Sequence, residues 1–439
     1  MKRLTSERRP FYLMYEIEAR ELRSRFFAAT KIAPIASKVV IFQHSELYKI
    51  ALFSRPGNVL IKSSSYTFLT ALRLMKIRGF QIFQHQEEGI HLDSKSDVPL
   101  TMSRQSNNQC DHYLAWHEND ARVAQLAGFN REQIAIVGNM RFEYLVHRKR
   151  DRRLNTKKKL RILVLTNFDY TKLIYRKPKK GNLDEMVGVT KVQESLVEQA
   201  QLGHQNQALY SQLFEDSRLN HFDVKIRRYF YETRNPDSDV LKIATDGNLN
   251  YFDSLDTADI VLHYGSTGGL EGVFLGLPSL ILTSDISLLN PAIASSSTIF
   301  TNLDDLFETL HKFDRDRSSL QTVSSAQMER SGESYGFRLE ESKQIDKLIQ
   351  LSVNSVHSRS TFTKYGVWFT AYIFYLKSRI RIAYNFLRRV ESVRKASKLN
   401  DENLNLHLEI LKAGGFFEYR IQWFGKVVNL RLIDVKQNE

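Results

Sequence analysis

Residues 260–282 combine a strand, a glycine-rich turn, a helix and a second strand within a short stretch of sequence. Ile260–His263 is an apolar run that leads into the turn Gly-Ser-Thr-Gly-Gly. Gly276 and Pro278 then separate the helical residues from a second apolar run, Ser279–Leu282. Short apolar runs bounded by turn residues indicate buried strands, and a helix between two of them is typical of α/β proteins. This segment therefore restricts the chain to a fold in which strands and helices alternate.

The start of the helix in this segment is a candidate binding site for an anion. Ser266 or Thr267 is placed to cap the helix, and glycines at 265 and 268 frame its first turn. Free N–H groups and the positive end of a helix dipole suit a phosphate, so Gly265, Ser266, Thr267 and Gly268 are predicted to bind a phosphate-bearing substrate. Glu271, one turn further, is within reach of a ribose hydroxyl or an acceptor, and an exposed helix charge is its alternative. A turn that merely connects a strand to a helix is the alternative for the whole segment.

Candidate strands alternate with helical segments along most of the chain. The strands are predicted at Phe11–Tyr15, Val39–Phe42, Val59–Lys62, Phe80–Gln84, Asp111–Trp116, Ile134–Val137, Leu160–Thr166, Phe222–Arg227, Leu241–Ala244, Ile260–His263 and Ser279–Leu282. This alternation predicts an α/β protein with parallel, doubly wound sheets. A basic run at residues 148–159 reads as a linker, so we expect two Rossmann-like domains, 1–155 and 156–355, that face each other across a cleft. A basic aromatic helix and a small appendage are expected at 356–439.

The composition indicates a globular protein with an anionic partner. The 439 residues carry a formal net charge of +14, and the single cysteine, Cys110, excludes a disulfide framework and a cysteine-rich zinc site. No stretch approaches the ~20 apolar residues of a membrane span, and no signal-peptide core follows the basic N-terminus, so a cytoplasmic location is expected. Phosphate-bearing small molecules and an anionic membrane surface explain the charge equally well. No nucleic-acid-binding motif is present, so no nucleic-acid partner is expected.

Acidic residues after the strand predicted at 80–84 are candidates for a general base. Glu87 and Glu88 follow His85 in a loop that contains Gly89, at the carboxyl end of a strand in the first domain. A carboxylate there can take a proton from an acceptor hydroxyl, and repulsion between adjacent carboxylates raises the pKa of one of them. We expect these side chains to face the cleft. A solvated acidic loop is the alternative.

Polar residues at other turns extend the candidate site. Asn139 and Arg141 lie in a turn after the strand predicted at Ile134–Val137, and Arg suits a phosphate or carboxylate because it binds both oxygens at once. A surface pair of Arg141 with Glu143 is the alternative. Arg20, early in the first helix, is a candidate for the cleft, and Asn167, just past the first strand of the second domain, for donor binding. The twelve histidines are scattered without metal-binding spacing, so no metal site is expected.

Four of these segments, in this order, resemble motifs of the two-Rossmann (GT-B) glycosyltransferases, in particular bacterial surface-carbohydrate biosynthesis proteins. They are Glu18–Leu22 for Glu-x-Arg-Glu-Leu, Glu87–Gly89 for the acidic-acidic-Gly loop, Gly138–Phe142 for Gly-Asn-Pro-Arg-Phe with Met140 in place of Pro, and Gly265–Pro278 for Gly-Ser-Thr…Glu-Ala…Gly-x-Pro. The resemblance covers roughly residues 11–285. It implies transfer of a sugar from a nucleotide-activated donor to a glycan or lipid-linked acceptor, with no metal and no cofactor besides the nucleotide-sugar substrate.

The acidic loop and the Ser-Thr pair also resemble bacterial transferases that use CMP-activated acidic sugars. The resemblance implies that Glu87 or Glu88 is the base and that Ser266 and Thr267 clamp the donor. Those transferases contact the donor phosphate with a His-Pro motif, whereas this chain has Arg-Arg-Tyr-Phe-Tyr at the corresponding strand end. Arg228 is the candidate replacement, and a different donor or a loss of activity are the alternatives. A sugar-nucleotide 2-epimerase of the same architecture and a non-catalytic component of a polysaccharide assembly complex are the other candidate functions.

The character of the chain changes after about residue 355. Tyr365–Leu376 is apolar and aromatic, and several lysines and arginines follow it. A basic aromatic helix can lie on the anionic inner face of a membrane, which is one interpretation of this segment. A C-terminal helix that packs back onto the first domain is the other.

Overall fold

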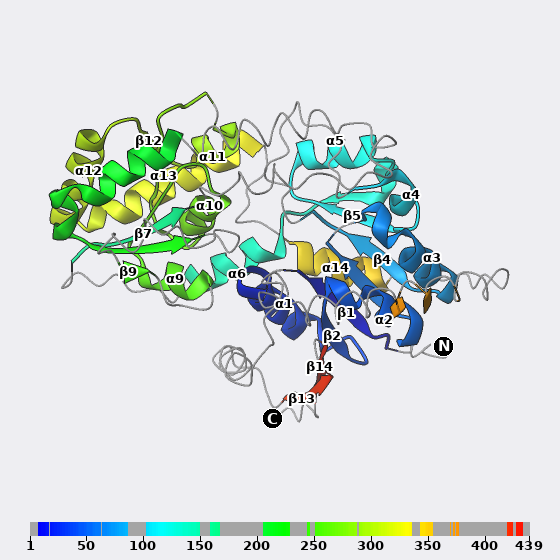
Figure 1. Ribbon diagram of the computed structural model, residues 1–439. Coiled ribbons are helices and arrows are strands. Elements are labelled where there is room, and N and C mark those ends of the chain that lie inside the picture. Colours follow the sequence, from blue (N-terminus) through cyan, green and yellow to red (C-terminus); the bar gives the residue numbers. More distant parts are fainter. Residues whose placement is uncertain are drawn as a thin grey trace. The chain divides into compact units, whose positions relative to one another are not determined.

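The computed structural model describes residues 8–16, 18–62, 64–86, 102–149, 159–166, 205–228, 244–245, 251–287, 289–335, 343–353, 369, 372–373, 375–376, 419–424 and 427–432. The chain divides into two compact units (Figure 1). Unit 1 consists of Met1–Tyr144 together with Leu339–Glu439, and unit 2 of Leu145–Arg338. The segment after residue 338 therefore returns to the unit in which the chain began. The domain boundaries predicted from the sequence, after residues 155 and 355, differ from these.

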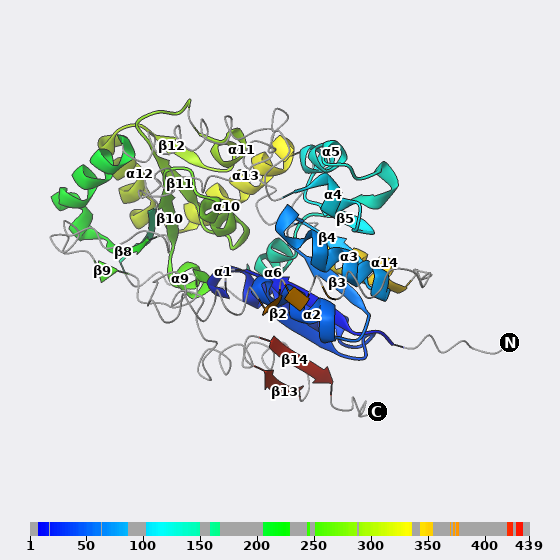
Figure 2. The ribbon, with the colours of Figure 1, turned by 45° about the vertical axis from the view of Figure 1, so that its right-hand side comes forward.

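Unit 1 is built on a sheet that has, in the described residues, the strand order β13-β14-β2-β1-β3-β4-β5-β6. Its parallel strands are β1 (Phe11–Tyr15), β2 (Val39–Gln43), β3 (Asn58–Ile61), β4 (Gln81–Gln84), β5 (His112–Ala115) and β6 (Ile134–Ile136). A hairpin of β13 (Tyr419–Phe424) and β14 (Val427–Leu432) extends the sheet, because β14 pairs antiparallel with β2 (Figure 2). The C-terminal appendage expected from the sequence is thus a β-hairpin on the edge of the first sheet.

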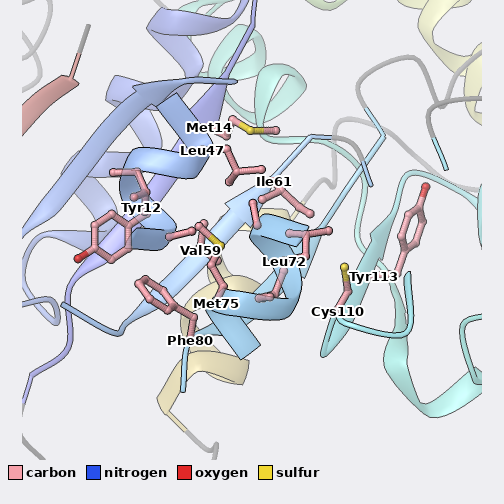
Figure 3. Packing of buried hydrophobic residues seen from close by; sticks show 14 of the residues in the cluster. Tyr12, Met14, Leu47, Val59, Ile61, Leu72, Met75, Phe80, Cys110 and Tyr113 are labelled. Carbon is pink, nitrogen blue, oxygen red and sulfur yellow. The ribbon is translucent and has the colours of Figure 1, made fainter. Parts of the chain in front are cut away.

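Helices cover the sheet of unit 1 and bury its apolar side chains. They are α1 (Glu18–Ile32), α2 (Leu47–Phe53), α3 (Leu69–Arg78), α4 (Arg104–Asn107), α5 (Glu118–Leu126), α6 (Met140–Lys149) and α14 (Gln344–Val353). Alternate residues of β1 enter different clusters: Tyr12 and Met14 pack with α2 and α3 (Figure 3), and Leu13 and Tyr15 pack with α1 and α14. Each large apolar side chain buried in this way contributes about 1.5–3 kcal/mol. The sheet is therefore stabilised by packing on both of its faces.

Helix α14 is attached to unit 1 by polar contacts at its first turn. The Gln344 side-chain oxygen accepts the backbone N–H of Met140 at 2.9 Å, and the Glu143 carboxylate accepts the backbone N–H of Ile345 at 3.0 Å. Burial raises the pKa of Glu143 to about 7, and this backbone bond and the charge of Lys31 only partly oppose the rise. The helix start at 344 and the turn at 139–140 therefore hold each other in place.

Unit 2 contains, within the residues that are described, a parallel sheet in the order β12-β11-β10-β7-β8-β9. The strands are β7 (Arg161–Thr166), β8 (Asp223–Arg228), β9 (Ala244–Thr245), β10 (Ile260–His263), β11 (Ser279–Leu282) and β12 (Thr298–Phe300). Residues 205–215 are helical, and further helices are α9 (Tyr251–Thr257), α10 (Thr267–Phe274), α11 (Pro291–Ser295), α12 (Leu303–Arg315) and α13 (Ser318–Tyr335). Each unit is built on parallel strands flanked by helices, with the antiparallel hairpin added at one edge in unit 1, so the predicted fold class of two Rossmann-like domains is confirmed.

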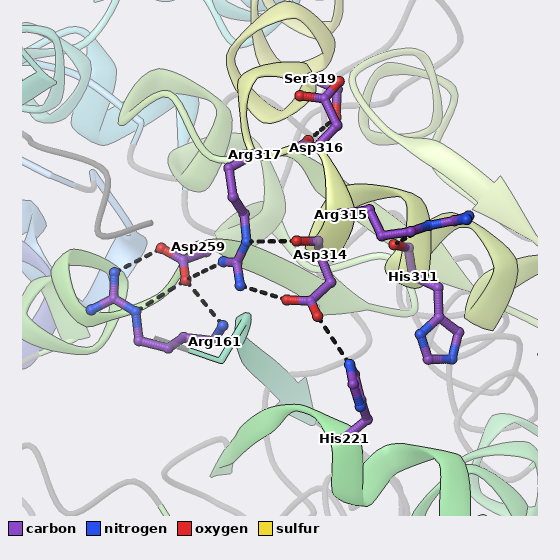
Figure 4. Close-up of polar contacts among 9 residues, drawn as sticks. All are labelled: Arg161, His221, Asp259, His311, Asp314, Arg315, Asp316, Arg317 and Ser319. Carbon is purple, nitrogen blue, oxygen red and sulfur yellow. Dashed lines mark hydrogen bonds and ion pairs between the residues drawn. The ribbon is translucent and has the colours of Figure 1, made fainter. Parts of the chain in front are cut away.

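Charged side chains tie together the amino ends of the strands in unit 2 (Figure 4). Asp259, just before β10, accepts bonds from the backbone N–H of Arg161 at 3.0 Å and from its guanidinium at 2.7 and 3.1 Å. Arg317, which precedes α13, contacts the same carboxylate at 3.4 Å. These ion pairs join the starts of β7, β10 and α13, and ligands of such folds bind at the other end, at the carboxyl ends of the strands.

No helix in the described part of the chain is both long enough and apolar enough to cross a membrane.

Candidate functional site

The glycine-rich turn of unit 2 lies at the carboxyl end of β10 and leads into α10. Ser266 has extended backbone angles, φ −80° and ψ 140°, and its side-chain oxygen accepts the backbone N–H of Gly268 at 3.1 Å. These are the properties of an N-cap residue. The predicted cap is therefore confirmed at Ser266, and Thr267 is the first residue of the helix.

His263, the last residue of β10, fixes this turn by accepting hydrogen bonds from its backbone. Its Nδ1 accepts the backbone N–H groups of Gly265 and Ser266, both at 3.0 Å, while its Nε2 lies 2.8 Å from Ser279 Oγ. A ring nitrogen that accepts two N–H bonds carries no proton, so the proton resides on Nε2 and is donated to Ser279. Burial lowers the pKa of His263 to about 3. The imidazole is therefore neutral and fixed in one tautomer.

The hydrogen bonds continue from His263 in one direction. Ser279 Oγ lies 2.8 Å from Ser297 Oγ, and Ser297 Oγ donates to the carbonyl of Ile293 at 3.0 Å. Because Ser297 has given its only proton to that carbonyl, it accepts from Ser279. The turn is thus connected through β11 to the end of α11 by a chain of buried, fully assigned hydrogen bonds.

Glycines let α10 lie against the sheet without a gap. A Cβ built on Gly269 would overlap His263 Nε2 and come 2.5 Å from Ser279 Oγ, and one on Gly272 would come 2.7 Å from Val261. Gly265 has φ +125°, a conformation that other residues rarely adopt. The small residues of this motif therefore have a packing role that is independent of any ligand.

The same contacts define what the turn offers to an anion. The backbone N–H groups of Gly265 and Ser266 donate to His263, that of Gly268 to Ser266 Oγ, and that of Gly269 to the Ser266 carbonyl at 3.0 Å. A ligand at this turn would therefore meet the side chain of Ser266 and the helix dipole, rather than a row of free backbone N–H groups.

Other predicted donor-binding residues of unit 2 have different outcomes. Glu271 is fully buried in α10, so the alternative of an exposed helix charge is wrong. Arg227 donates to Ser254 Oγ at 2.7 Å and lies over the ring of Tyr251. Asn167 and the side chain of Arg228 lie outside the described residues, and their donor-binding roles stay predictions.

In unit 1, His85 follows β4 and forms a hydrogen bond with Arg25, which was not among the residues predicted for the site. Arg25, on α1, donates from Nη2 to His85 Nε2 at 3.2 Å and from Nε to the carbonyl of Met14 at 2.8 Å. A guanidinium only donates, so His85 Nε2 accepts and the ring is a neutral Nδ1–H tautomer. His85 is fully buried. Glu87 and Glu88 lie outside the described residues, and their role as general base stays a prediction.

An ion cluster lies at the carboxyl ends of β1 and β3, with Lys62 and Glu21 buried and Glu16 exposed. Lys62 Nζ is 2.7 Å from a carboxylate oxygen of Glu21 and 2.7 Å from one of Glu16, and the second oxygen of Glu21 accepts the backbone N–H of Glu16 at 2.7 Å. Removing one partner of such a buried pair is strongly destabilising. Glu21 and Arg25 are four residues apart on the buried face of α1, and charges at that spacing were the available sequence signal. Arg20 is in α1, but its side chain lies outside the described residues.

The turn after β6 positions the last two predicted residues. Asn139 accepts the backbone N–H of Arg141 with its side-chain oxygen at 2.8 Å. The Arg141 guanidinium is buried, 5.7 Å from the ring centroid of Trp116 and 5.9 Å from that of Phe142. A surface pair of Arg141 with Glu143 is therefore wrong as an alternative. A contact of Arg141 with a phosphate or carboxylate stays a prediction.

A buried carboxylate holds the loop that carries Trp116. Asp120 accepts the hydroxyl of Tyr113 at 2.6 Å and the backbone N–H of Trp116 at 2.8 Å, and burial raises its pKa to about 7. Across the described ranges, no three His, Cys, Asp or Glu side chains are grouped as a metal ion would require. The polar side chains that surround the carboxyl ends of the strands in unit 1 are thus arranged by one another.

Comparisons with known proteins find similarity in structure only. No family model matches the chain, and no curated protein matches its sequence. A putative UDP-N-acetylglucosamine 2-epimerase from Listeria monocytogenes matches with a TM-score of 0.52 and 11% identity over 80% of this chain and 98% of that one. A UDP-GlcNAc 2-epimerase from Neisseria meningitidis bound to UDP-GlcNAc matches with 0.48 and 12% over 79% and 100%, and the wall teichoic acid polymerase TagF with 0.47 and 14% over 79% and 90%. The Listeria structure supports the GT-B type of fold for this chain.

Proposed function

We propose that this chain is a glycosyltransferase that moves a sugar from a nucleotide-activated donor to a growing surface glycan. The supporting observation is the turn at the end of β10, where Ser266 caps α10 and His263 holds the backbone rigidly from beneath. The carboxyl ends of parallel strands are where α/β proteins bind ligands, and helix starts favour phosphate. The fold and this turn together favour a nucleotide-sugar as the substrate.

The proposed transfer breaks one bond and forms one. The acceptor hydroxyl attacks the anomeric carbon of the donor sugar and gives its proton to a carboxylate, for which Glu87 and Glu88 are the candidates. The bond from that carbon to the phosphate oxygen breaks, and negative charge develops on the leaving nucleotide. In this proposal, the hydroxyls of Ser266 and Thr267 and the positive end of α10 stabilise that charge. A CMP-linked acidic sugar is the specific donor suggested by the Ser-Thr pair.

One nucleotide among CMP, UDP and GDP is expected to stabilise the chain against heat. A ligand that binds only the folded state adds about 2.7 kcal/mol at a concentration one hundred times its Kd, which corresponds to roughly 5–10 °C in Tm for a unit of this size. Differential scanning fluorimetry measures this shift. Ser266→Ala and Thr267→Val should reduce the nucleotide-induced shift, each compared with its own ligand-free Tm, because loss of the cap alone costs about 1 kcal/mol.

Ser211→Ala is the matched control for these variants, since Ser211 is an exposed serine on the helical residues 205–215 of the same unit. Its nucleotide-induced shift should equal that of the unchanged chain. If the nucleotide raised the Tm of Ser266→Ala and Thr267→Val as much as that of the unchanged chain, the nucleotide would bind elsewhere. No shift with any of the three nucleotides would remove the support for a nucleotide-sugar donor.

Activity with and without an acceptor separates transfer from epimerisation. The Listeria structure with a similar fold is described as a putative UDP-N-acetylglucosamine 2-epimerase. Incubation of the chain with the nucleotide-sugar alone, without an acceptor, is therefore the decisive experiment. A transferase yields a lengthened acceptor, whereas an epimerase converts the donor by itself. The double change Glu87→Gln with Glu88→Gln is expected to lower transfer by about 10²–10⁴-fold through loss of the base, while Glu132→Gln, an exposed glutamate of unit 1, should have no effect. Full glycan synthesis by the double variant in a null strain would overturn the catalytic role of that loop.

A further inference from the structure

An exposed apolar patch on unit 1 is formed by two segments that are distant in sequence. Phe53, the last residue of α2, is 56% exposed, and Phe369 and Leu376 are 61% and 42% exposed. The ring of Tyr375 lies 5.7 Å from that of Phe53 at an interplanar angle of 76°, which joins the two segments edge to face. Large apolar side chains that gather at one surface, rather than singly, mark a place where something else binds.

The second segment, residues 369–376, contains both packed and exposed side chains. At the positions that are described between 369 and 376 the chain is helical, and Tyr372 and Tyr375 pack against the core of unit 1. Phe369 and Leu376 are seven residues apart, and both remain exposed. A helix packed on the first unit and a helix that meets a membrane were alternatives in the sequence. The structure makes them compatible, because Tyr372 and Tyr375 provide the attachment while Phe369 and Leu376 remain exposed.

Two basic residues flank Phe53 in the chain. Lys49, one turn before Phe53 on α2, is partly exposed with its Nζ 3.9 Å from Glu46, and Arg55 is exposed two residues after Phe53. The sequence from 361 to 394 has seven basic residues and one acidic residue, Glu391. Apolar side chains with surrounding lysine and arginine are the combination that binds to anionic lipid headgroups and the acyl boundary beneath them.

We propose that Phe53, Phe369 and Leu376, with Lys49 and Arg55, dock unit 1 on an anionic lipid bilayer. The apolar side chains enter the interface and the cations pair with the headgroups. An acceptor anchored in lipid would then be presented to the chain at the membrane surface. The docking itself is independent of the proposed glycosyl transfer, because none of these residues belongs to the candidate donor or base site.

Co-sedimentation of the full chain with vesicles tests the proposal without any nucleotide. The chain should bind vesicles of phosphatidylcholine with phosphatidylglycerol and should bind pure phosphatidylcholine vesicles much more weakly. The double change Phe369→Ser with Leu376→Ser is expected to weaken binding to the anionic vesicles by about tenfold or more. Lys49→Glu with Arg55→Glu should weaken it by a similar factor and reduce its dependence on salt.

Leu126→Ser is the matched control, because Leu126 ends α5 of the same unit and is 58% exposed. It should bind like the unchanged chain, and the Phe369→Ser, Leu376→Ser and Leu126→Ser variants should keep its Tm, since these altered side chains are exposed. Equal sedimentation of the Phe369→Ser, Leu376→Ser variant and the unchanged chain would overturn the proposal, as would equal binding to neutral and anionic vesicles, or none to either. A dimer in light scattering that this variant dissociates, with no vesicle binding, would assign the patch to a second copy of the chain instead.

Discussion

Replacement of Gly269 by alanine is expected to destroy the native packing of unit 2. The added methyl group would overlap His263 Nε2 and lie 2.5 Å from Ser279 Oγ, and both atoms belong to the buried hydrogen-bond chain below the turn. Neither can move away without breaking the bonds that hold Gly265 and Ser266. Overpacking typically costs 1–3 kcal/mol and each buried group left without its bond a further 1–3, so we expect a loss of about 4 kcal/mol or more. That is a large part of the 5–15 kcal/mol by which a typical domain is stable.

Gly79→Ala is the informative comparison for this prediction. Gly79 has φ +85° at the end of α3, but no atom lies within 4 Å of the position that an added methyl group would take, so its substitution adds backbone strain without overlap. We expect a cost of about 1 kcal/mol at Gly79, measured for both variants by urea unfolding. Similar free energies of unfolding for the two variants would show that the contact of Gly269 with His263 is not made.

Acid is expected to destabilise unit 2 through His263. Burial lowers the pKa of this imidazole to about 3 in the folded chain, whereas an exposed histidine titrates near pH 6.5. Between these values the unfolded chain binds a proton that the folded chain does not. The free energy of unfolding therefore falls as the pH is lowered from about 6.5, by about 1.4 kcal/mol per pH unit, and this contribution is complete above that pH.

His263→Asn tests the assignment. The asparagine side-chain oxygen can accept the backbone N–H groups of Gly265 and Ser266, as Nδ1 does, but the side chain does not titrate. Urea unfolding at pH 7 and pH 5 should therefore give a smaller pH dependence for this variant than for the unchanged chain. His311→Asn, which changes a histidine on α12, should retain the full dependence of unit 2 on His263. The same loss of stability in acid with and without His263 would contradict the prediction.

The sequence predicts the strands well because each is a short apolar run between turn residues. Phe11–Tyr15, Ile260–His263 and Ser279–Leu282 have the predicted bounds, and most other strands differ by one or two residues at their ends. The cap at Ser266 also follows from local sequence, since a cap depends on neighbours two residues away. Thr298–Phe300 is not predicted, because only Ile299 and Phe300 are apolar and serines precede them.

The contacts that arrange the candidate site depend on residues far apart in the sequence. Arg25 meets His85 across 60 residues, and Lys62 meets Glu21 across 41. A single sequence shows no signal for such pairs beyond an unexpected charge on a buried helix face. His263 was treated only as the end of a strand, because its role depends on a tautomer fixed by two backbone groups and by Ser279. The return of the chain to unit 1 after residue 338 likewise has no local signature.

The division of unit 1 into two stretches of chain has a consequence for biosynthesis. Translation completes residues 145–338, and with them every described strand of unit 2, before Gln344 and Ile345 are synthesised. Only then can these two residues form their hydrogen bonds with Met140 and Glu143. Domains generally fold as units while the chain emerges. We therefore expect unit 2 to reach its native state on the ribosome first. Residues 1–144 of unit 1 can complete their fold only after residues 339–439, with α14 and β14, have been synthesised. Residues 1–144 are then the part that most depends on chaperones while synthesis is under way.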